Sequence, residues 1–177
     1  MNKFEKVSSI VYINSVINEF HEGNFSTLTT EESNAFKKEW DDIPLPRRAT
    51  KNSAGYDFFA PSGFVLKPNQ TITIPTGIKC CLDEDKFLAI VPRSSLGFKY
   101  TVRLANTLGV IDADFFGNPS NEGHIFIKLT NESKENKELT IKKGEAFAQG
   151  IILSFYKVEE DKTTEERKGG IGSTNKK

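Results

Sequence analysis

The feature that most constrains the fold is a regular succession of short apolar runs, which begins near residue 45 and continues to about residue 156. The runs are four to eight residues long, are rich in Val, Ile, Phe and Thr, and are separated by Gly, Pro, Asn and Asp. β-Branched and aromatic residues between such turn formers are typical of strands. The pattern therefore predicts an all-β sandwich or barrel.

Two of these runs indicate different environments for their strands. "TITI" (71–74) alternates polar and apolar residues, which predicts one wet face and one packed face. "FLAIV" (87–91) is apolar throughout, which predicts burial on both faces. A strand of the second kind needs a covering surface, which can come from a second sheet of the same chain or from a subunit interface.

The segment 13–43 differs from the rest of the chain and predicts a small helical insertion. In "TTEESNAFKKEWDDI", Thr29 and Glu32 have the spacing of a capping box, and Phe36 and Trp40 lie four residues apart on one helix face. "INSVINEFHEG" before it predicts a second helix that ends near Gly23. The insertion either packs on the β domain or binds a regulatory protein through Phe36 and Trp40.

Composition limits the class of protein and its compartment. The chain has 177 residues, enough for one domain over 1–177, and its 24 basic and 24 acidic residues balance, so nothing favours nucleic acid or a membrane surface. No apolar run is long enough to span a bilayer. Cys80 and Cys81 are adjacent in a predicted strand, where a disulfide is geometrically poor. We expect a soluble cytoplasmic protein.

A polar group follows the buried strand directly. Arg93, Ser94 and Ser95 come after Pro92, where a scaffold can present a loop, and a guanidinium with neighbouring hydroxyls suits phosphate oxygens. A plain turn with a surface arginine is the alternative. Ser94 is a poor candidate for a hydrolytic nucleophile, because neither histidine of the chain lies in a recognisable triad context.

The stretch "NTLGVIDADFFG" (106–117) places further polar side chains in an apolar run. Asn106 can both donate to and accept from a base edge. Asp112 and Asp114 would share a face of an extended chain, where a carboxylate can orient and deprotonate water. Phe115 and Phe116 offer apolar surface for a sugar or base. The alternative is a β-hairpin with Asp at its turn.

Two further features of the sequence concern metal binding and the C-terminal tail. No His or Cys cluster has zinc spacing, so carboxylates beside a phosphate chain indicate Mg²⁺ held mostly by substrate and water. The polar tail 163–177 reads as a flexible end on composition. However, Arg167 followed by "GGIGST" would also suit an arm that closes over a phosphate chain.

Five stretches occur in a familiar order, namely "SAGYDFFA", "PRSSLG", "NTLGVIDADFFG", "GEAFAQGI" and "RKGGIGST". Over roughly residues 44–175 the chain resembles the trimeric dUTPases, the dUTP diphosphatases. The resemblance implies a jelly-roll-like β fold and a homotrimer with three active sites at subunit interfaces. It also implies hydrolysis of dUTP to dUMP and pyrophosphate with Mg²⁺, which lowers dUTP and supplies dUMP for thymidylate synthesis.

By motif matching, the resemblance implies that Asp112 orients the attacking water and meets the 3′-hydroxyl. It implies that Asn106 reads uracil with help from the backbone near Val110, and that Phe115 packs under the deoxyribose where the family usually has Tyr. Asp57 matches the carboxylate that reaches Mg²⁺ through water. The remaining substrate contacts that it implies are Arg93, Ser94, Ser95, Gln149, Arg167, Ile171, Ser173 and Thr174.

The chain also departs from the family pattern. Ile171 replaces the usual aromatic of the last motif, Ser95 stands where Gly is frequent, and "GNPSNEGHIF" carries about six extra residues. Stacking over uracil would then come from elsewhere, with Phe98, Tyr100 and Phe116 as candidates.

Two alternative functions stay open at this stage. A dCTP deaminase shares the fold and the "PRSS" motif, but Lys128 occupies the position of that family's proton-shuttling Glu. A lysine cannot shuttle the proton as that carboxylate does, so deamination is disfavoured. The other alternative is a phage-type dUTPase with an added regulatory role, which would hold a protein partner through 13–43.

Overall fold

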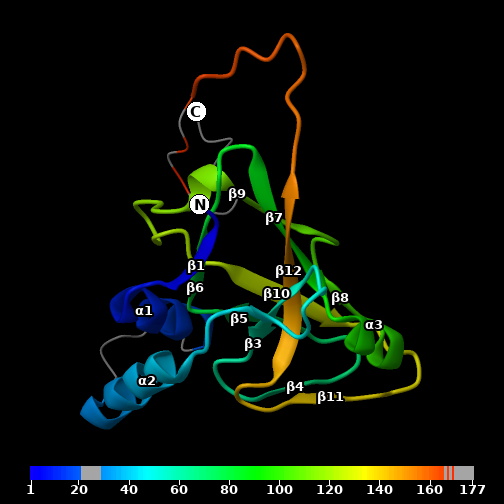
Figure 1. Cartoon of the computed structure of the whole chain (residues 1–177). Helices are drawn as coiled ribbons and strands as arrows, with labels where there is room; N and C mark the ends of the chain where they lie inside the picture. Colours follow the sequence, from blue (N-terminus) through cyan, green and yellow to red (C-terminus); the bar gives the residue numbers. More distant parts are fainter. Residues whose placement is uncertain (21–28, 166, 168, 170–177) are drawn as a thin grey trace.

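The computed structural model describes residues 1–20, 29–165, 167 and 169. It is mainly β, as the sequence predicts, and the strands pair antiparallel throughout the described part (Figure 1). The strands are β1 (Lys3–Lys6), β2 (Arg47–Arg48), β3 (Tyr56–Phe59), β4 (Phe64–Leu66), β5 (Thr71–Pro75), β6 (Ile78–Cys81), β7 (Lys86–Pro92), β8 (Val102–Leu104), β9 (Gly109–Asp112), β10 (Phe126–Asn131), β11 (Leu139–Ile141) and β12 (Ala146–Ser154). The helices are α1 (Ser9–Phe20), α2 (Thr30–Asp42), α3 (Ser94–Tyr100) and the 3-10 helix η2 (Ala113–Phe115).

The strands form two larger sheets and two pairs. One sheet has the order β2-β3-β12-β7-β9, and the other has the order β5-β10-β8. The pairs are β1 with β6 and β11 with β4. In the larger sheet β7 lies between β12 and β9, so it joins the last long strand to the strand that ends at Asp112. This central position of β7 determines where the polar clusters described below lie.

The core contains residues from both larger sheets. Leu88, Ala89 and Ile90 of β7 are buried, which confirms the prediction for "FLAIV". The alternation predicted for "TITI" is found in part, because Thr71 is exposed and Ile74 is buried while the two residues between them are half-buried. The hydrophobic cluster also includes buried residues of α1, so the N-terminal helix shares the core of the β domain.

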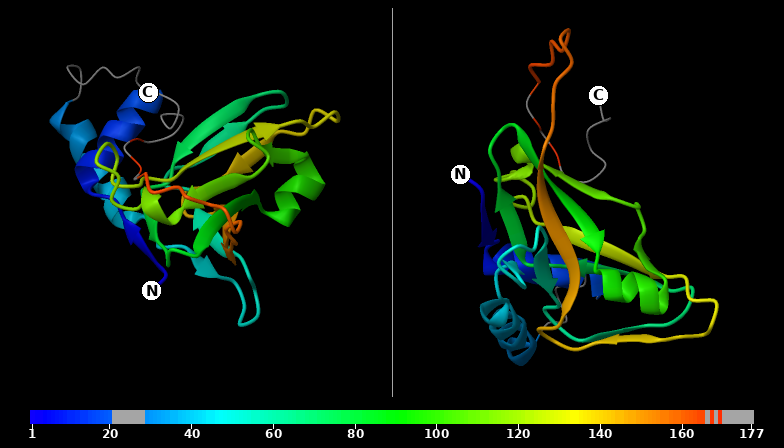
Figure 2. Two further views of the ribbon diagram at one scale, coloured as in Figure 1. Left: turned by 90° about the horizontal axis from the view of Figure 1, so that it is seen from above. Right: turned by 45° about the vertical axis from the view of Figure 1, so that its right-hand side comes forward.

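The structure has two helices in the N-terminal segment, as the sequence predicts. Thr29 and Glu32 form the expected capping box at the start of α2. α1 begins at Ser9, earlier than the predicted boundary at residue 13, and its predicted end near Gly23 lies outside the described residues. Figure 2 shows α1 and α2 side by side at one end of the molecule, with α3 at the other.

The face of α2 that was expected to anchor a partner packs against this chain. Phe36 and Trp40 are partly buried against the core, and Trp40 Nε1 donates a hydrogen bond of 2.8 Å to the Val7 carbonyl. A partner that used these two side chains would have to replace those contacts. The regulatory role of 13–43 therefore stays a prediction whose proposed anchor is already engaged.

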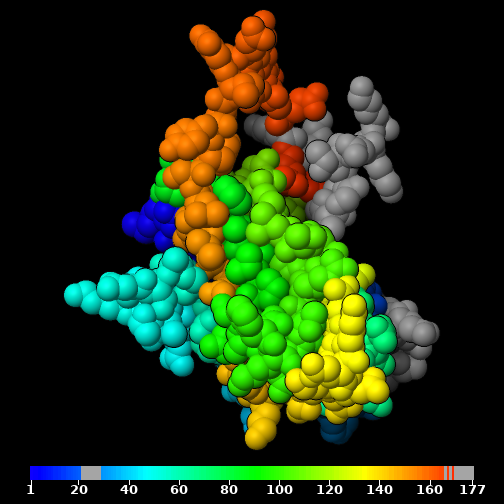
Figure 3. All heavy atoms as spheres, turned by 90° about the vertical axis from the view of Figure 1, so that its right-hand side faces the viewer, coloured from blue at the N-terminus to red at the C-terminus, as the bar shows by residue number. Residues whose placement is uncertain are grey.

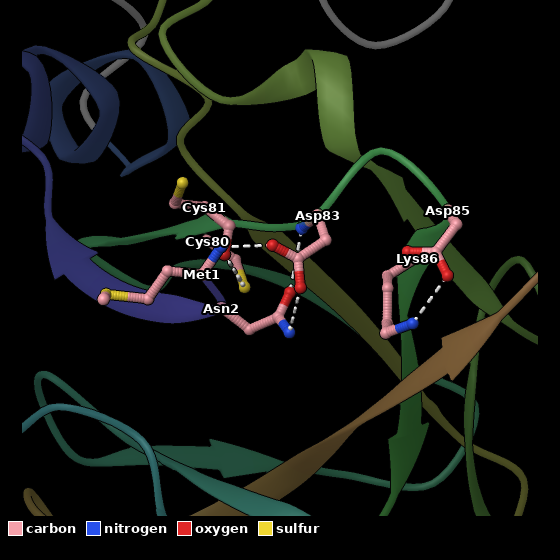
Figure 4. Close-up of polar contacts among 7 residues, drawn as sticks. All are labelled: Met1, Asn2, Cys80, Cys81, Asp83, Asp85 and Lys86. Atoms are coloured by element: carbon pink, nitrogen blue, oxygen red, sulfur yellow. Dashed lines mark hydrogen bonds and ion pairs between the residues drawn. The ribbon is translucent and has the colours of Figure 1, made fainter.

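The first strand is held on β6 by side chains as well as by the backbone. Asn2 and Asp83 exchange hydrogen bonds of 3.0 Å and 2.9 Å at the end of the β1–β6 pair (Figure 4). Cys80 and Cys81 both lie in β6 and are free thiols, in agreement with the expectation that they form no disulfide. Burial raises the pKa of the Cys80 thiol to about 12.

Two local predictions were wrong. The "PRSS" segment was expected to form a loop or plain turn, but Arg93 is the N-cap of α3, and Leu96 buries its side chain on the core. Asp112 and Asp114 were expected to share a face of an extended chain, but the residues after Asp112 form η2. Burial of Leu96 and of Phe115 explains these short helices, because one helical turn directs each side chain inward.

The chain leaves the body of the molecule after β12 and turns back toward β9 (orange and red, Figure 1). The turn between β2 and β3 projects from the surface at the left of Figure 3 (cyan). Within the described residues, none of the helices combines the length and the apolar character needed to cross a membrane.

Candidate functional site

A cavity of about 650 Å³ opens beside β9 and brings together several predicted site residues. Asn106, Val110, Asp112, Phe115 and Arg167 all line it. Its other described lining residues are Glu19, Thr73, Ile90, Leu104, Ala105, Gly109, Ile111, His124, Ile125, Phe126 and Lys128. Apolar residues form just over half of this lining, and a concave site that combines apolar walls with polar groups is the usual form of a small-molecule pocket.

The turn between β8 and β9 presents the predicted base-reading groups. Asn106 is exposed in this turn, where the Leu108 N–H donates to its carbonyl at 2.7 Å and Thr107 has a φ of 66°. Val110 pairs with Ala89 of β7 and is 52% exposed, and its strand, β9, is an edge strand of the larger sheet. An amide in this turn and backbone groups of the strand that follows it can together match the edge of a base.

The carboxylates at the end of β9 hold the guanidinium of Arg167. Arg167 hydrogen-bonds to Asp112 through one Nη, and its Nε donates to Asp114 at 2.7 Å. The hydrogen bond to Asp114, together with the charge of both carboxylates, raises the pKa of Arg167. The guanidinium also lies 5.8 Å from the ring of Phe115, which is buried. Arg167 of the C-terminal segment thus reaches the predicted catalytic carboxylate.

A second cluster forms where β3, β7 and β12 lie side by side. Arg93 Nε is 3.3 Å from Asp57 Oδ1, and Arg93 Nη1 donates to the Ala146 carbonyl at 3.2 Å. Gln149 is opposite Asp57 in the β12–β3 register, and its amide donates to the Pro92 carbonyl at 3.3 Å. A guanidinium carries five N–H donors, so these contacts leave donors for an anion.

Three further residues, Gly55, Ser94 and Ser95, adjoin this second cluster. A Cβ at Gly55 would lie 2.2 Å from Gln149 Oε1, so only glycine lets that amide lie against the backbone. Ser94 and Ser95 are exposed at the start of α3, directly after Arg93. The resemblance to the dUTPases predicts that Asp57, Arg93, Ser94, Ser95 and Gln149 lie near the phosphates or their Mg²⁺, and we call this group the phosphate cluster.

The cavity and the phosphate cluster lie apart in one copy of the chain. No member of the phosphate cluster is among the described residues that line the cavity. Along β7, Asp112 is opposite Phe87 and Gln149 is opposite Val91, on the two different edges of the strand. Four residues of strand correspond to roughly 13 Å, and the two edges add about 10 Å across the sheet.

Sequence reasoning missed part of the cavity wall. His124 was considered only as a triad base, yet it is buried at the wall, and burial lowers its pKa to about 3. Glu19 of α1 and Thr73 of β5 also line the cavity, and no local pattern signals either of them. Lys128 was singled out as the residue that disfavours deamination, and it lines the same cavity. The predicted contacts Ile171, Ser173 and Thr174 lie outside the described residues.

The antiparallel β fold, with a carboxylate at a cavity of about 650 Å³ and a separate cluster around Arg93, defines the class of β proteins with a small-molecule pocket. Comparison with known proteins identifies the particular family. The sequence model of the dUTPase family matches residues 41–175, so the chain belongs to that family. The chain hydrolyses dUTP as a deoxyuridine 5′-triphosphate nucleotidohydrolase.

Curated relatives and solved structures agree on this family. The enzyme of Lactococcus lactis is 40% identical over 134 residues, covering 75% of this chain and 88% of the relative. That of Dictyoglomus turgidum is 37% identical over 142 residues, covering 75% and 91%. The Streptococcus mutans dUTPase structure has a TM-score of 0.58 at 33% identity and covers 65% of this chain and 88% of that one. A Staphylococcus bacteriophage 80alpha dUTPase has a TM-score of 0.60 at 19% identity, covers 94% of this chain and 98% of its own, and shows likeness of fold alone.

Proposed function

We propose that the cavity binds the deoxyuridine part of dUTP, and that the phosphate cluster of another copy of the chain completes the site in a homotrimer. The separation of the two halves carries this proposal, because Asp112 and Arg93 would both have to reach the phosphate chain. Association of identical copies can bring surfaces that are far apart in one chain to the same interface. The resemblance of the sequence to the trimeric dUTPases is a further reason to expect a homotrimer.

The chemistry follows from the groups that would meet there. Asp112 is half-exposed at the end of β9, where its carboxylate can orient a water molecule and accept its proton. Attack of that water on the α-phosphorus forms a new P–O bond and releases pyrophosphate, which leaves dUMP. Negative charge grows on the non-bridging and departing oxygens, and Arg93 from the other copy would stabilise it.

The donor set suits Mg²⁺ that is held mainly by the substrate. No group of three His, Cys, Asp or Glu side chains that could hold a metal occurs within the described residues. Asp57 supplies a carboxylate beside Arg93, a hard oxygen donor that can bind the hydration shell of the ion. When bound, Mg²⁺ would neutralise charge on the triphosphate. Asp57 and Arg93 would then position the phosphate chain between them.

The C-terminal segment supplies the remaining cation. Arg167 is paired with Asp112 and Asp114 in this structure, so a triphosphate would compete with the two carboxylates for its guanidinium. Transfer of Arg167 to the phosphates would free Asp112 to hold water. The tail 163–177, including the predicted contacts Ile171, Ser173 and Thr174, would serve as the closing arm that excludes bulk water.

The remaining parts of the proposal concern the chain as a whole. We place the enzyme in the cytoplasm, where dUMP would feed thymidylate synthesis, and the two free cysteines support a reducing compartment. We treat 1–177 as one domain, because buried residues of α1 and of both larger sheets belong to one hydrophobic cluster.

One assay of pyrophosphate release tests the proposed chemistry. Pyrophosphate release is measured from dUTP, dCTP, dTTP and UTP, each with Mg²⁺ and with a chelator in its place. With Mg²⁺, we expect rapid release of pyrophosphate from dUTP and from none of the other three nucleotides. The chelator should abolish this release, and added Mg²⁺ should restore it. Comparable rates with dCTP, or full activity in the presence of chelator, would contradict the proposed base recognition or the role of Mg²⁺ respectively.

A further inference from the structure

A helix that precedes the part of the chain matched by the family model, residues 41–175, lies against the segment that carries the extra residues. The helix is α1, and the segment is 117–124, which we call the cavity loop. The backbone N–H of Ser8, just before α1, donates to Glu122 Oε2 at 3.1 Å, and Lys79 binds the same oxygen at 2.9 Å. Ser15 Oγ of α1 lies 3.0 Å from His124 Nδ1. The helix is thus attached to the end of the loop at two points.

The hydrogen bonds around His124 fix its orientation and its tautomer. The Gly77 N–H donates to Nε2 at 2.8 Å, so the ring proton resides on Nδ1. Ser15 Oγ donates to the Val11 carbonyl at 2.8 Å and can therefore accept from Nδ1. Both ring nitrogens of this fully buried side chain are satisfied, and one of the two partners belongs to α1.

The cavity loop is closed by its own hydrogen bonds and packs closely against the backbone of η2. These hydrogen bonds include Gly117 N–H to the Glu122 carbonyl at 3.1 Å and His124 N–H to the Asn121 carbonyl at 2.9 Å. Gly123 has a φ of +83°, and a Cβ there would lie 2.4 Å from the Phe115 carbonyl oxygen. A displacement of the loop would therefore displace η2.

His124 also touches the cavity wall through its ring. The ring centroid lies 4.6 Å from that of Phe126, which lines the cavity together with His124. Tyr12 of α1 flanks the imidazole at 6.3 Å. A continuous set of contacts thus runs from α1 through His124 to two parts of the cavity, the wall at Phe126 and the 3-10 helix at Phe115.

We propose that α1 sets the shape of the nucleoside cavity through the cavity loop, with His124 as a positioning residue. The inference rests on the proposed function, since it assumes that the cavity binds deoxyuridine. α1 then does more than stabilise the fold, because it aligns the apolar surface under the deoxyribose. The phosphate cluster lies elsewhere in the chain and is independent of α1.

This independence provides the test. Ser15→Ala in the full chain removes the acceptor of the buried Nδ1–H, and we measure dissociation constants for dUMP and for pyrophosphate separately. The dissociation constant for dUMP reports on the cavity, whereas the dissociation constant for pyrophosphate reports on the phosphate cluster. We expect the dUMP constant and the KM for dUTP to rise about threefold to tenfold, with the pyrophosphate constant unchanged.

Three variants control for a merely structural effect. Asn14→Ala removes an exposed polar group from the same helix and should leave both constants unchanged. Ser15→Thr keeps the hydroxyl and should restore dUMP binding. His124→Gln should weaken dUMP binding in the same selective way. The single tryptophan, Trp40 of α2, donates to the Val7 carbonyl just before α1, so its unchanged emission shows that the two helices remain docked.

The outcomes separate the inference from the function on which it rests. Ser15→Ala and His124→Gln proteins with docked helices and unaltered dUMP affinity would overturn the positioning role. Equal loss of dUMP and pyrophosphate binding would also overturn it, because that result indicates a loss of active protein. If the unmodified chain hydrolyses dUTP but does not bind dUMP in the cavity, the proposed site itself is wrong.

Discussion

Burial of His124 predicts a specific loss of stability in acid. Its side chain is fully buried, and burial lowers its pKa from 6.5 to about 3, although the charge of Glu122 acts in the opposite direction. In the unfolded chain the imidazole takes up a proton below about pH 6.5. The folded protein stays neutral at this position until about pH 3. The unfolded state therefore binds more protons in this window, and stability falls as pH falls.

The magnitude follows from proton linkage. Each pH unit between the two pKa values changes the free energy of unfolding by about 1.4 kcal/mol, so this one residue removes about 2 kcal/mol between pH 8 and pH 5. The stabilising contribution of the neutral imidazole is fully present above the unfolded pKa. It is lost progressively on acidification below that value.

Urea unfolding of the unmodified chain and of His124→Gln measures this term. Both proteins are unfolded at pH 8, 6 and 5, at the same subunit concentration, because association contributes to apparent stability. Glu122 with Lys79, and Glu19 and Lys128 at the cavity, remain in both proteins, so the comparison isolates the effect of the imidazole. Between pH 8 and pH 5, we expect the free energy of unfolding of the variant to fall by about 2 kcal/mol less than that of the unmodified chain. Parallel curves would refute the argument, because they would mean that His124 titrates in the folded protein as it does in water.

Three further predictions follow from the site and the core. Asp112→Asn should lower the rate of pyrophosphate release about 100-fold or more, while calorimetry still detects binding of dUMP. Near-normal turnover would contradict the role of Asp112 in orienting the attacking water. Deletion of 165–177 should lower turnover about 100-fold without changing the sedimentation of the oligomer, and dissociation of the subunits would contradict a purely catalytic arm. Phe147→Ala empties the centre of the core, where this ring is fully buried and meets Phe64 edge-on at 6.0 Å. This substitution should lower the free energy of unfolding in urea by about 3–5 kcal/mol. A loss under about 1 kcal/mol would contradict the prediction, because it would mean that neighbouring side chains fill the space left by the ring.

The sequence predicted the elements whose signals are local. Alternating apolar runs and turn residues located most strands, and the spacing of Thr29 and Glu32 located the start of α2. Short helices were missed, because the seven residues of α3 and the three residues of η2 are too few to show a helical periodicity. Their direction is set by burial in the core, which depends on the whole fold.

Spatial relations within the site were harder to predict than its residues. The motifs named Asp112 and Arg93, but only the register along β7 shows that the two lie apart in one copy. The contact between Ser15 and His124 joins residues 109 positions apart in the sequence. Neither residue stands out locally, so the part that α1 plays in the cavity wall could only be found in three dimensions.

Mixing two inactive variants tests the central claim that different copies of the chain supply the two halves of one site. Asp112→Asn and Arg93→Ala proteins are unfolded together in equal amounts, refolded, and assayed for pyrophosphate release from dUTP. Random association gives about a quarter of the interfaces an intact Asp112 from one copy and an intact Arg93 from the other, so we predict about a quarter of normal activity. Activity no greater than that of either variant refolded alone, in oligomers shown to be mixed, would contradict the claim.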